Sequence, residues 1–331
     1  MHGDDLDVIR ELRCREGRDF SYQVEGESVV SLSLASDEAI FGGLIRHHSA
    51  QEKHEILVLI SRLRQLRTLD LRRCMLQGTP DEMGELVSLR HLDLGSNALG
   101  QVPGWIARIE DLEYLNLGVN ELAVLPTFLG KFVNMRTLLL HKNRIPVFPD
   151  VFSEMKRLDY LNLYLNRMQA IPPFIWDFSS LRTFTFGVSA LKELPEDIAR
   201  LHNLEFLTLA NTRIRYLPES FGALGKLKAT RLHKNQLCAL PESMGRLQNL
   251  EQISLYMNNL ESLPASFTSL RRLEKLNLAN NRFHSFPTQL AAIPWLSWLA
   301  YFDNPQQVDK PPFEFSGTFL GVRPFNARST A

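Results

Sequence analysis

Hydrophobic residues recur along this chain at a fixed spacing of 23 residues. From Leu66 onward, segments such as LRTLDLRRCMLQGTP and LRHLDLGSNALGQVP follow one another without insertion or deletion up to Trp295. Ten full copies cover 230 of the 331 residues, and a truncated eleventh copy, LSWLAYFDNP, begins at Leu296. A period of about 20–50 residues is typical of solenoids, in which stacked repeats share one continuous core. We therefore expect one solenoid rather than two or three globular domains.

The pattern within each copy predicts a short strand followed by a return segment. Apolar residues at the first, fourth and sixth positions point inward, and the third, fifth and seventh point outward, because side chains alternate along a strand. The same strand in the next copy would pair with it to give a parallel sheet. The Leu-Pro pair that usually follows cannot continue a central ladder, since proline has no N–H. The chain must then return over the opposite side.

Asparagine occupies the ninth position in seven of the ten full copies. A buried amide both donates and accepts hydrogen bonds, so stacked asparagines can satisfy backbone groups where each copy turns. The predicted asparagine ladder consists of Asn97, Asn120, Asn143, Asn166, Asn235, Asn258 and Asn281.

These copies resemble the leucine-rich-repeat family, whose pattern is LxxLxLxxNxLxxLPxxLxxLxx. The uniform 23-residue Leu-Pro copies are similar to those of intracellular Ras-group proteins and of many bacterial proteins. The resemblance implies an α/β solenoid, a horseshoe with a concave parallel β-sheet, convex short helices or irregular turns, and a cap at each end. Local departures from the pattern are Cys74, Ser189 and Thr212 in place of asparagine, and Thr230 at an inward position.

The ends of the chain depart from the repeat and predict caps. We expect residues 1–65 to form an N-terminal cap with an irregular first repeat, residues 66–295 the ten repeats, and residues 296–331 a partial eleventh repeat with a C-terminal cap. Within the first cap, apolar spacing predicts a helix over 4–15, and the residues of 29–34 repeat the inward pattern of a strand.

Further elements are expected in the same caps. The connection to the first regular copy is predicted to be helical over 51–63. At the other end, four aromatic residues are expected to cover the last rung, namely Phe313, Phe315, Phe319 and Phe325.

Charges at the second position of successive copies alternate strictly in sign. Neighbouring parallel strands bring these residues within ion-pair range, so opposite charges favour one register. Each exposed pair contributes only about 0.2–1 kcal/mol, and we interpret the column as structural rather than as a binding site. It consists of Arg90, Glu113, Arg136, Asp159, Arg182, Glu205, Lys228 and Glu251.

The other outward columns carry aromatic and basic residues on the face that lacks a core. Tyrosine and tryptophan supply large contact areas in binding hot spots, and the expected concave face has a formal excess of three positive charges. Alternation of large and small neighbours, or duplication of a four-copy unit, would explain part of the same pattern. Our hypothesis is that a mildly acidic protein surface binds at Tyr114, His141, Lys142, Tyr160, Tyr164, Phe206, Arg231, His233, Lys234 and Tyr256.

Composition restricts the remaining possibilities. The chain has 37 basic and 37 acidic residues, which disfavours general nucleic-acid binding. No apolar run is long enough for a membrane span, and three scattered cysteines fit a reducing, cytoplasmic compartment without a disulfide framework. His47, His48 and His54 lack any metal-binding pattern. We expect a monomer with no metal, no cofactor and no catalytic residues.

The favoured function is a non-enzymatic protein-interaction module or scaffold in intracellular signalling. Two alternatives stay open at this stage. One is a secreted bacterial effector that binds a host protein through the same face. The other is an enzyme subunit whose active site is completed by a partner chain.

Overall fold

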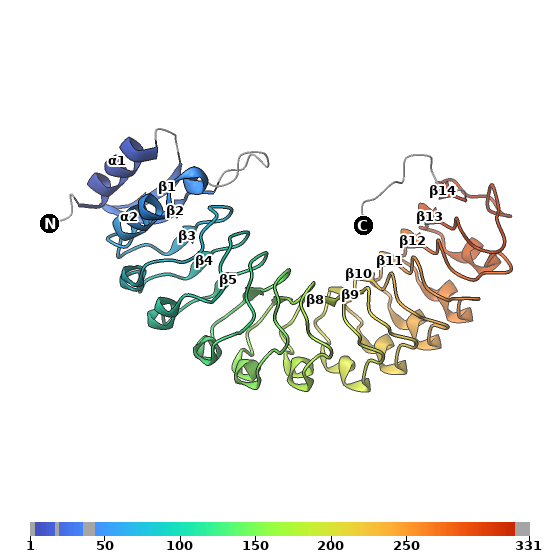
Figure 1. The fold of residues 1–331 in the computed structure, drawn as a ribbon. Coiled ribbons are helices and arrows are strands. Elements are labelled where there is room, and N and C mark those ends of the chain that lie inside the picture. Colours follow the sequence, from blue (N-terminus) through green and yellow to red (C-terminus); the bar gives the residue numbers. More distant parts are fainter. Residues whose placement is uncertain (1–3, 17–19, 36–43, 322–331) are drawn as a thin grey trace. The chain divides into compact units, whose positions relative to one another are not determined.

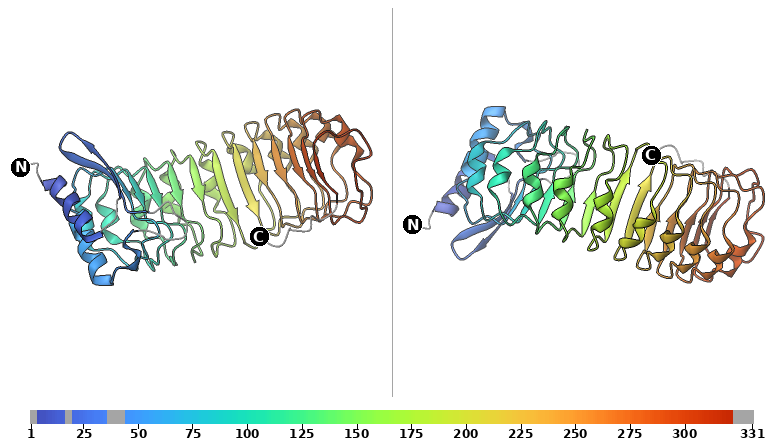
Figure 2. Two further views of the ribbon diagram at one scale, coloured as in Figure 1. Left: turned by 90° about the horizontal axis from the view of Figure 1, so that it is seen from above. Right: turned by 90° about the horizontal axis from the view of Figure 1, so that it is seen from below.

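The structure is a computed structural model that describes residues 4–16, 20–35 and 44–321. The chain divides into two compact units, Met1–Met168 and Gln169–Ala331. In each unit, strands lie side by side on one face and short 3₁₀ helices, labelled η, form the opposite face (Figures 1 and 2). The predicted α/β solenoid is thereby confirmed.

The first unit contains two α-helices before its regular copies. Its elements in chain order are α1 (Asp4–Glu16), β1 (Ser21–Glu25), β2 (Ser28–Ser33), η1 (Leu44–His47), α2 (Ala50–Ile60), β3 (Thr68–Asp70), η2 (Asp81–Glu85), β4 (His91–Asp93), η3 (Gly104–Arg108), β5 (Tyr114–Asn116), η4 (Thr127–Lys131), β6 (Thr137–Leu139), η5 (Asp150–Glu154) and β7 (Tyr160–Asn162).

The second unit continues the alternation of 3₁₀ helix and strand. Its elements are η6 (Pro173–Asp177), β8 (Thr183–Gly187), η7 (Glu196–Arg200), β9 (Phe206–Ala210), η8 (Glu219–Ala223), β10 (Ala229–Arg231), η9 (Glu242–Arg246), β11 (Gln252–Ser254), η10 (Ala265–Ser269), β12 (Lys275–Asn277), η11 (Thr288–Ala292), β13 (Trp298–Ala300) and β14 (Thr318–Leu320).

Strand pairing follows the 23-residue period of the sequence. From β3 to β7, each strand residue pairs in parallel with its equivalent in the next copy, as Leu115 does with Leu138. The inward side chains stack into continuous apolar columns. The copy that begins at Leu112 buries, from strand to 3₁₀ helix, Leu112, Leu115, Leu117, Leu122, Leu125, Leu129 and Phe132. Each such side chain stabilises the fold by about 1.5–3 kcal/mol relative to exposure to water.

Where the ninth position holds asparagine, its side chain connects that copy to the one before it. Asn120 Nδ2 donates to the carbonyl of Leu94 in the preceding copy (3.0 Å) and to that of Leu117 in its own copy (3.1 Å). Its Oδ1 accepts from the N–H of Leu99 in the preceding copy (3.0 Å). One amide therefore satisfies three buried backbone groups of two copies. Equivalent bonds are made by Asn97, Asn143, Asn166, Asn258 and Asn281.

The departures from asparagine change these bonds locally. Ser189 Oγ accepts from the N–H of Leu191 (3.3 Å), which closes a turn inside its own copy. The hydroxyl of Thr212 donates to Oδ1 of Asn235 in the next copy. Asn304, in the truncated copy, extends the ladder beyond the predicted set, because its amide bonds Leu278 in the preceding copy (3.1 Å).

The return segment starts at the proline that ends each Leu-Pro pair. The ten prolines at this repeat position, spaced 23 residues apart from Pro80 to Pro287, each directly precede a five-residue 3₁₀ helix. The fixed φ of proline is compatible with the first turn of a helix. A backbone N–H at this place would have no acceptor within the helix, so the lack of an N–H in proline costs no hydrogen bond. In the second unit, Glu196 accepts from the N–H of Ser220 (2.9 Å), and Glu242 accepts from that of Ser266 (3.0 Å). These carboxylates satisfy orphan donors at the start of the next 3₁₀ helix.

The N-terminal residues form the predicted helices and strand. The helix expected over 4–15 is α1, the strand expected over 29–34 is β2, and the helix expected over 51–63 is α2. Asp5 Oδ2 accepts from the N–H of Val29 (2.9 Å), and Ser49 with Glu52 forms a capping box at the start of α2. The sequence did not predict β1, which pairs antiparallel to β2 and is the one edge strand of that orientation among the described residues.

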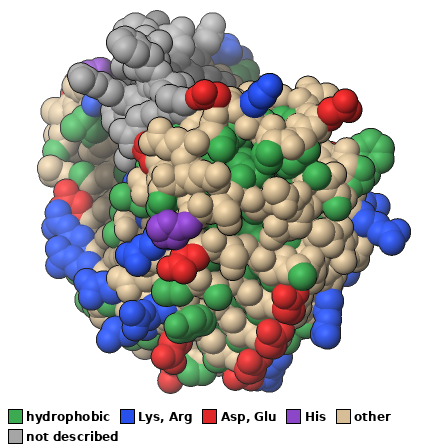
Figure 3. Space-filling view, turned by 90° about the vertical axis from the view of Figure 1, so that its right-hand side faces the viewer, with side chains coloured by type: hydrophobic (Ala, Val, Ile, Leu, Met, Phe, Trp, Pro, Cys, Tyr) green, Lys and Arg blue, Asp and Glu red, His purple; other side chains and the backbone are tan. Residues whose placement is uncertain are grey.

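At the C-terminal end of the second unit, aromatic rings pack in the predicted region. Phe286 lies 4.8 Å from Tyr301, 5.9 Å from Phe313 and 6.2 Å from Phe319, measured between ring centroids. Phe319 belongs to β14, an additional parallel strand that the sequence did not predict. In the view onto this end, hydrophobic side chains are exposed in several places among backbone and uncharged polar side chains (Figure 3). Phe325 lies outside the described residues.

The eighth position of each copy adopts a left-handed backbone conformation. Eleven of the twelve described non-glycine residues with positive φ occupy this position, directly before the ninth position. Asparagine tolerates this conformation well, and Asn211 and Asn280 provide it. Val119 and Val188, both at φ 57°, are β-branched and strained there.

Replacing a ladder asparagine should destabilise the protein strongly. Asn120→Ala leaves the buried N–H of Leu99 without its acceptor and removes one of the two amide donors from each of the carbonyls of Leu94 and Leu117, so we expect the free energy of unfolding to fall by about 2–4 kcal/mol. Urea unfolding followed by circular dichroism measures this loss. Asn134→Ala is the matched control, because Asn134 bonds Asp111 and Arg157 at the surface. Equal losses in the two variants would contradict the role of the ladder.

Relief of backbone strain should have the opposite effect. Val119→Asn keeps the backbone N–H that bonds the carbonyl of His141 (2.7 Å) and removes a β-branched residue from positive φ. We expect the unfolding free energy to rise by about 1 kcal/mol. Val133→Asn, another half-exposed valine but without positive φ, should show no such gain. Similar changes in both variants would rule out strain as the cause.

Candidate partner-binding surface

The strand face of each unit is the sheet surface opposite the apolar core. It carries the third, fifth and seventh residues of each copy, with the eighth residue at its border. In the first unit it presents Tyr114, His141, Lys142, Tyr160 and Tyr164, and in the second unit Phe206, Arg231, His233, Lys234 and Tyr256. The structure therefore brings five of the predicted residues together in each unit.

Beside the strand face, charges at the second position form ion pairs between copies. Glu113 lies between Arg90 (3.1 Å) and Arg136 (3.7 Å) of the neighbouring copies. Because these side chains are partly exposed, each pair adds at most about 1 kcal/mol. Their charges are directed at each other rather than at a partner. The same arrangement recurs in the second unit with Arg182, Glu205 and Lys228, at 3.5 and 2.6 Å.

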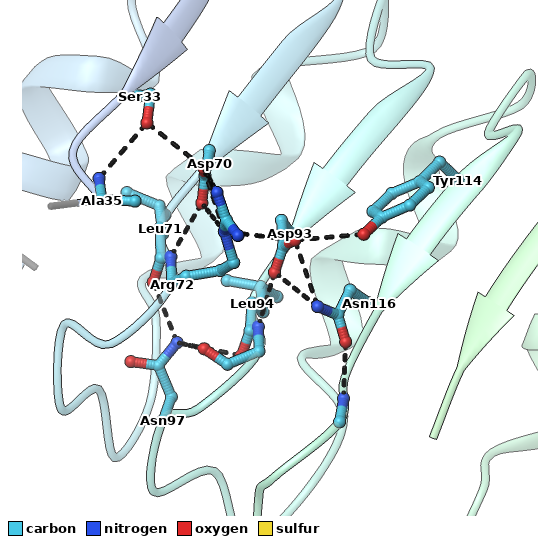
Figure 4. A network of polar contacts seen from close by, with 12 residues as sticks. Ser33, Ala35, Asp70, Leu71, Arg72, Asp93, Leu94, Asn97, Tyr114 and Asn116 are labelled. Atoms are coloured by element: carbon cyan, nitrogen blue, oxygen red, sulfur yellow. Dashed lines mark hydrogen bonds and ion pairs between the residues drawn. The ribbon is translucent and has the colours of Figure 1, made fainter. Parts of the chain in front are cut away.

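A polar network fixes the strand face over β3, β4 and β5 (Figure 4). Arg72 lies between Asp70 (2.7 Å) and Asp93 (3.5 Å), and Asp93 also accepts from Asn116 Nδ2 (2.9 Å). Burial raises the pKa of the Asp93 carboxyl, while bonds from the Gly95 N–H and Asn116 oppose this rise. Both carboxylates are thus engaged within the protein.

Tyr114 joins this network through its ring and its hydroxyl. The hydroxyl donates to Asp93 (3.2 Å), and the ring stacks on His91 with centroids 4.7 Å apart and planes 10° from parallel. Burial is the main cause that raises the pKa of the Tyr114 hydroxyl, and the nearby Asp93 adds to it. The ring is half-buried, so these internal contacts hold it in one orientation. The sequence did not predict the contribution of His91.

His141 and Tyr164 occupy the seventh positions of neighbouring copies in the first unit, and together with Tyr160 they are named the aromatic cluster after their shared strand face. The imidazole of His141 packs over Gly118, where an added Cβ would lie only 2.3 Å from its Cε1. Its Nδ1 is buried without a hydrogen-bond partner among the described residues. Burial, and to a smaller degree the charge of Lys142, lower the pKa of His141. Tyr164 is half-buried, whereas Tyr160 keeps 36% of its surface exposed.

The second unit presents an exposed ring next to basic residues. Phe206 on β9 is 46% exposed, and Arg231 on β10 is also exposed. Burial, followed by the charges of Lys234 and Arg231, lowers the pKa of His233. The Tyr256 ring lies 6.4 Å from that of Phe302. The strand face here combines aromatic and cationic groups with few acidic neighbours.

Two features of this surface were missed at the sequence level. Met257, at an eighth position, is 43% exposed beside Tyr256. Trp298 and Lys275 occupy third positions on β13 and β12 and line a hollow together with Arg231. The sequence could have predicted the place of Trp298, because it is the third residue of the truncated copy, LSWLAYFDNP, and third residues point to the strand face.

Models of known protein families match most of the repeat region. A "leucine-rich repeat region" model matches residues 46–184, and a "leucine rich repeat" model matches residues 226–283. The chain belongs to the leucine-rich-repeat family. Such domains are generally protein-binding modules and are typically non-catalytic. No curated protein sequence matches the chain significantly.

Solved structures with the same fold come from bacterial leucine-rich-repeat proteins. One from Leptospira interrogans is 28% identical, with a TM-score of 0.68, over 75% of this chain and 69% of that protein. An internalin from Listeria monocytogenes is 16% identical, with a TM-score of 0.69, over 97% and 96% of the two chains. The functional domain of InlJ from the same species, which includes a cysteine ladder, is 15% identical with a TM-score of 0.61, over 76% and 56%. The two Listeria proteins share the fold of this chain.

Metal sites and membrane-spanning helices each have recognisable structural requirements. Among residues 4–16, 20–35 and 44–321, no group of three or more His, Cys, Asp or Glu side chains is arranged to hold a metal ion. No helix in this described part is long and apolar enough to cross a membrane. The strand face, with Tyr160 exposed in the first unit and Phe206 in the second, is the candidate binding surface.

The buried imidazole of His141 should make stability depend on pH. Because its folded-state pKa is lowered, protonation favours the unfolded chain, and stability should fall as the pH drops below the ordinary histidine value of about 6.5. Urea unfolding at pH 7.5 and pH 5.5 measures this loss, and the loss should be smaller in His141→Asn. An NMR titration should show the His141 midpoint below that of a free histidine. An identical loss in wild type and variant would contradict the assignment.

Proposed function

We propose that this protein is a non-enzymatic interaction module that binds another protein on its strand face. The observation that carries the proposal is the set of exposed rings on regular strands, with Tyr160 at 36% and Phe206 at 46% exposure. Exposed aromatic side chains on a rigid support lose little entropy on binding and are frequent hot-spot residues. The rings would contact the partner, and the sheet beneath them would hold their positions.

In the first unit, the aromatic cluster supports a compact contact region. Tyr160 and Tyr164 stand two strand-face positions apart in one copy, and His141 occupies the preceding copy. The carbonyl of Tyr164 accepts from the N–H of Lys142 (2.8 Å), which fixes the two copies against each other at this point. A partner would meet a preformed aromatic surface.

The charge of the strand face supports a partner of mild acidity. Formal charges at its positions in the second unit are Arg231, Lys234 and Lys275 against Asp303. In the first unit, Asp70 and Asp93 are already engaged by Arg72. Complementary charge raises association rates and disfavours positively charged partners.

The same contacts support a binding role without catalysis. A catalytic carboxylate or nucleophile would need an oxygen or sulfur directed at open space. Asp93 instead receives bonds from Asn116, Gly95 and Tyr114. We further propose a scaffold or signalling role in a reducing, cytoplasmic compartment, supported by Cys14, Cys74 and Cys238, which form no disulfide with one another.

Removal of the aromatic cluster should abolish partner capture. We expect Tyr160→Ala combined with Tyr164→Ala to weaken binding at least about tenfold, since each aromatic hot spot contributes about 2 kcal/mol. Affinity capture from a lysate of the source organism, quantified by mass spectrometry, measures this loss for the partner that wild type retains.

The control variant removes apolar surface elsewhere on the same unit. Val124→Ala combined with Val147→Ala changes two valines that are 72% and 63% exposed outside the strand face. Capture by this control should equal that of wild type. Full capture by the tyrosine variant, with circular dichroism showing both variants folded, would overturn the proposed surface.

A further inference from the structure

A hollow of about 400 Å³ opens on the strand face of the second unit, over β10, β11 and β12. Its shape follows from the strand register. At third positions Ala229, Gln252, Lys275 and Trp298 are aligned, and at fifth positions Arg231 is aligned with Ser254. The short side chains of Ala229 and Ser254 leave space where other copies carry larger groups. Longer side chains on both sides form the walls.

Two cations face this space from opposite sides. Arg231 is on β10 and Lys275 is on β12, so their backbones are separated by the width of two strand spacings, about 10 Å. Both side chains are exposed and long enough to reach the space above β11. A single group of about carboxylate size above Ser254 could contact both. The side-chain amide of Gln252 lines the same space and adds a neutral donor.

These two cations lack an ion-pair partner within the described part of the chain. No ion pair joins Arg231 or Lys275 to a described carboxylate, and no acidic residue lines the hollow. Lys228, one strand position away from the same hollow, is by contrast paired with Glu205 at 2.6 Å. Positive charge is therefore left uncompensated at the hollow while it is neutralised at its border. Such a site is complementary to an anion.

The surroundings of the hollow favour a protein segment as the source of that anion. Phe206 pairs in register with Ala229 on the adjacent strand, so its exposed ring borders the hollow. Trp298 forms the opposite wall. A side chain with an acidic end and an aliphatic stem would place its methylene groups against Trp298, and apolar residues beside it would contact Phe206. Free inorganic anions would use the charges but leave the two rings uncovered.

We propose that the hollow binds a glutamate or aspartate side chain from an acidic segment of the protein partner. The carboxylate lies between Arg231 and Lys275, the Gln252 amide donates to it, and Trp298 covers the aliphatic stem. This inference rests on the proposed function, since it names the partner chemistry for the strand face of the second unit.

The first test uses a defined probe and does not require the partner. Acetyl-glutamate amide is titrated into ¹⁵N-labelled protein at constant ionic strength, and the indole N–H signal of Trp298 is followed. The chain has four tryptophans, so Trp298→Phe identifies the signal. We expect a saturable shift, and at least tenfold weaker binding for acetyl-glutamine amide, which has nearly the same shape without the charge. Equal binding of the two probes would overturn the proposal.

Variants then assign the effect to the two cations. Arg231→Gln combined with Lys275→Gln should weaken binding of the glutamate probe at least tenfold. Arg213→Gln combined with Arg282→Gln, which removes two exposed arginines from tenth positions outside the hollow, should leave binding unchanged. Retained binding in the first variant would show that the anion binds elsewhere, which contradicts the assignment.

The second test uses the captured partner and separates this inference from the proposed function. The Arg231→Gln and Lys275→Gln variant should retain at least tenfold less partner than wild type. If the probe binds but partner capture is unaffected, the hollow serves a free carboxylic acid and the docking proposal is wrong. If wild type captures a partner and neither test responds to the variant, the hollow has no role while the proposed function stands. Probe binding without any captured partner would instead contradict the proposed function.

Discussion

The side-chain amide at the ninth position of most copies is the interaction on which the rest of the structure depends. Where the strand ends, backbone groups of two consecutive copies turn into the interior and cannot reach water. Asn120 satisfies the carbonyls of Leu94 and Leu117 and the N–H of Leu99 with one amide. Because this set spans two copies, it fixes the offset between them at 23 residues, and a shift of even one residue would break it.

That fixed offset decides what each outward column can do. Equivalent residues of neighbouring copies lie one strand spacing apart. The residues at one repeat position therefore form a continuous stripe on the surface, and their charge and polarity are those of the stripe. At the second position the charges neutralise each other, as around Glu113. At the third positions from Tyr114 to Ala229, rings alternate with small residues, and Tyr160 stays exposed there. At the seventh positions, His141 packs on the small Gly118 of the preceding copy. The strand face is rigid because its columns are attached to the ladder, and a rigid aromatic face loses little entropy when it binds.

The sequence predicted the features that repeat and missed those that occur once. The parallel strands, the core columns and the asparagine positions follow from the 23-residue period, which is repeated in ten copies of the sequence. The antiparallel strand β1 and the last strand β14 belong to single segments, for which no period exists. The network of Arg72, Asp93 and Tyr114 also escaped prediction, because it depends on which side chains of three different copies reach one another. The hollow near Trp298 exists because the side chains of Ala229 and Ser254 are small. The sequence prediction relied on the positions of large aromatic and basic residues, so it did not find a space left by small ones.

The central claim is that the ladder presents a strand face that contacts a protein partner. Site-specific photo-cross-linking tests it most directly, with p-benzoylphenylalanine placed in the intact protein at either of two positions. One position is 160, on the strand face, and the other is 124, whose native valine is 72% exposed outside that face. Irradiation with the captured partner should give a cross-linked product from position 160 and none from position 124. A product from position 124 alone would show that the partner binds another surface and would contradict the claim.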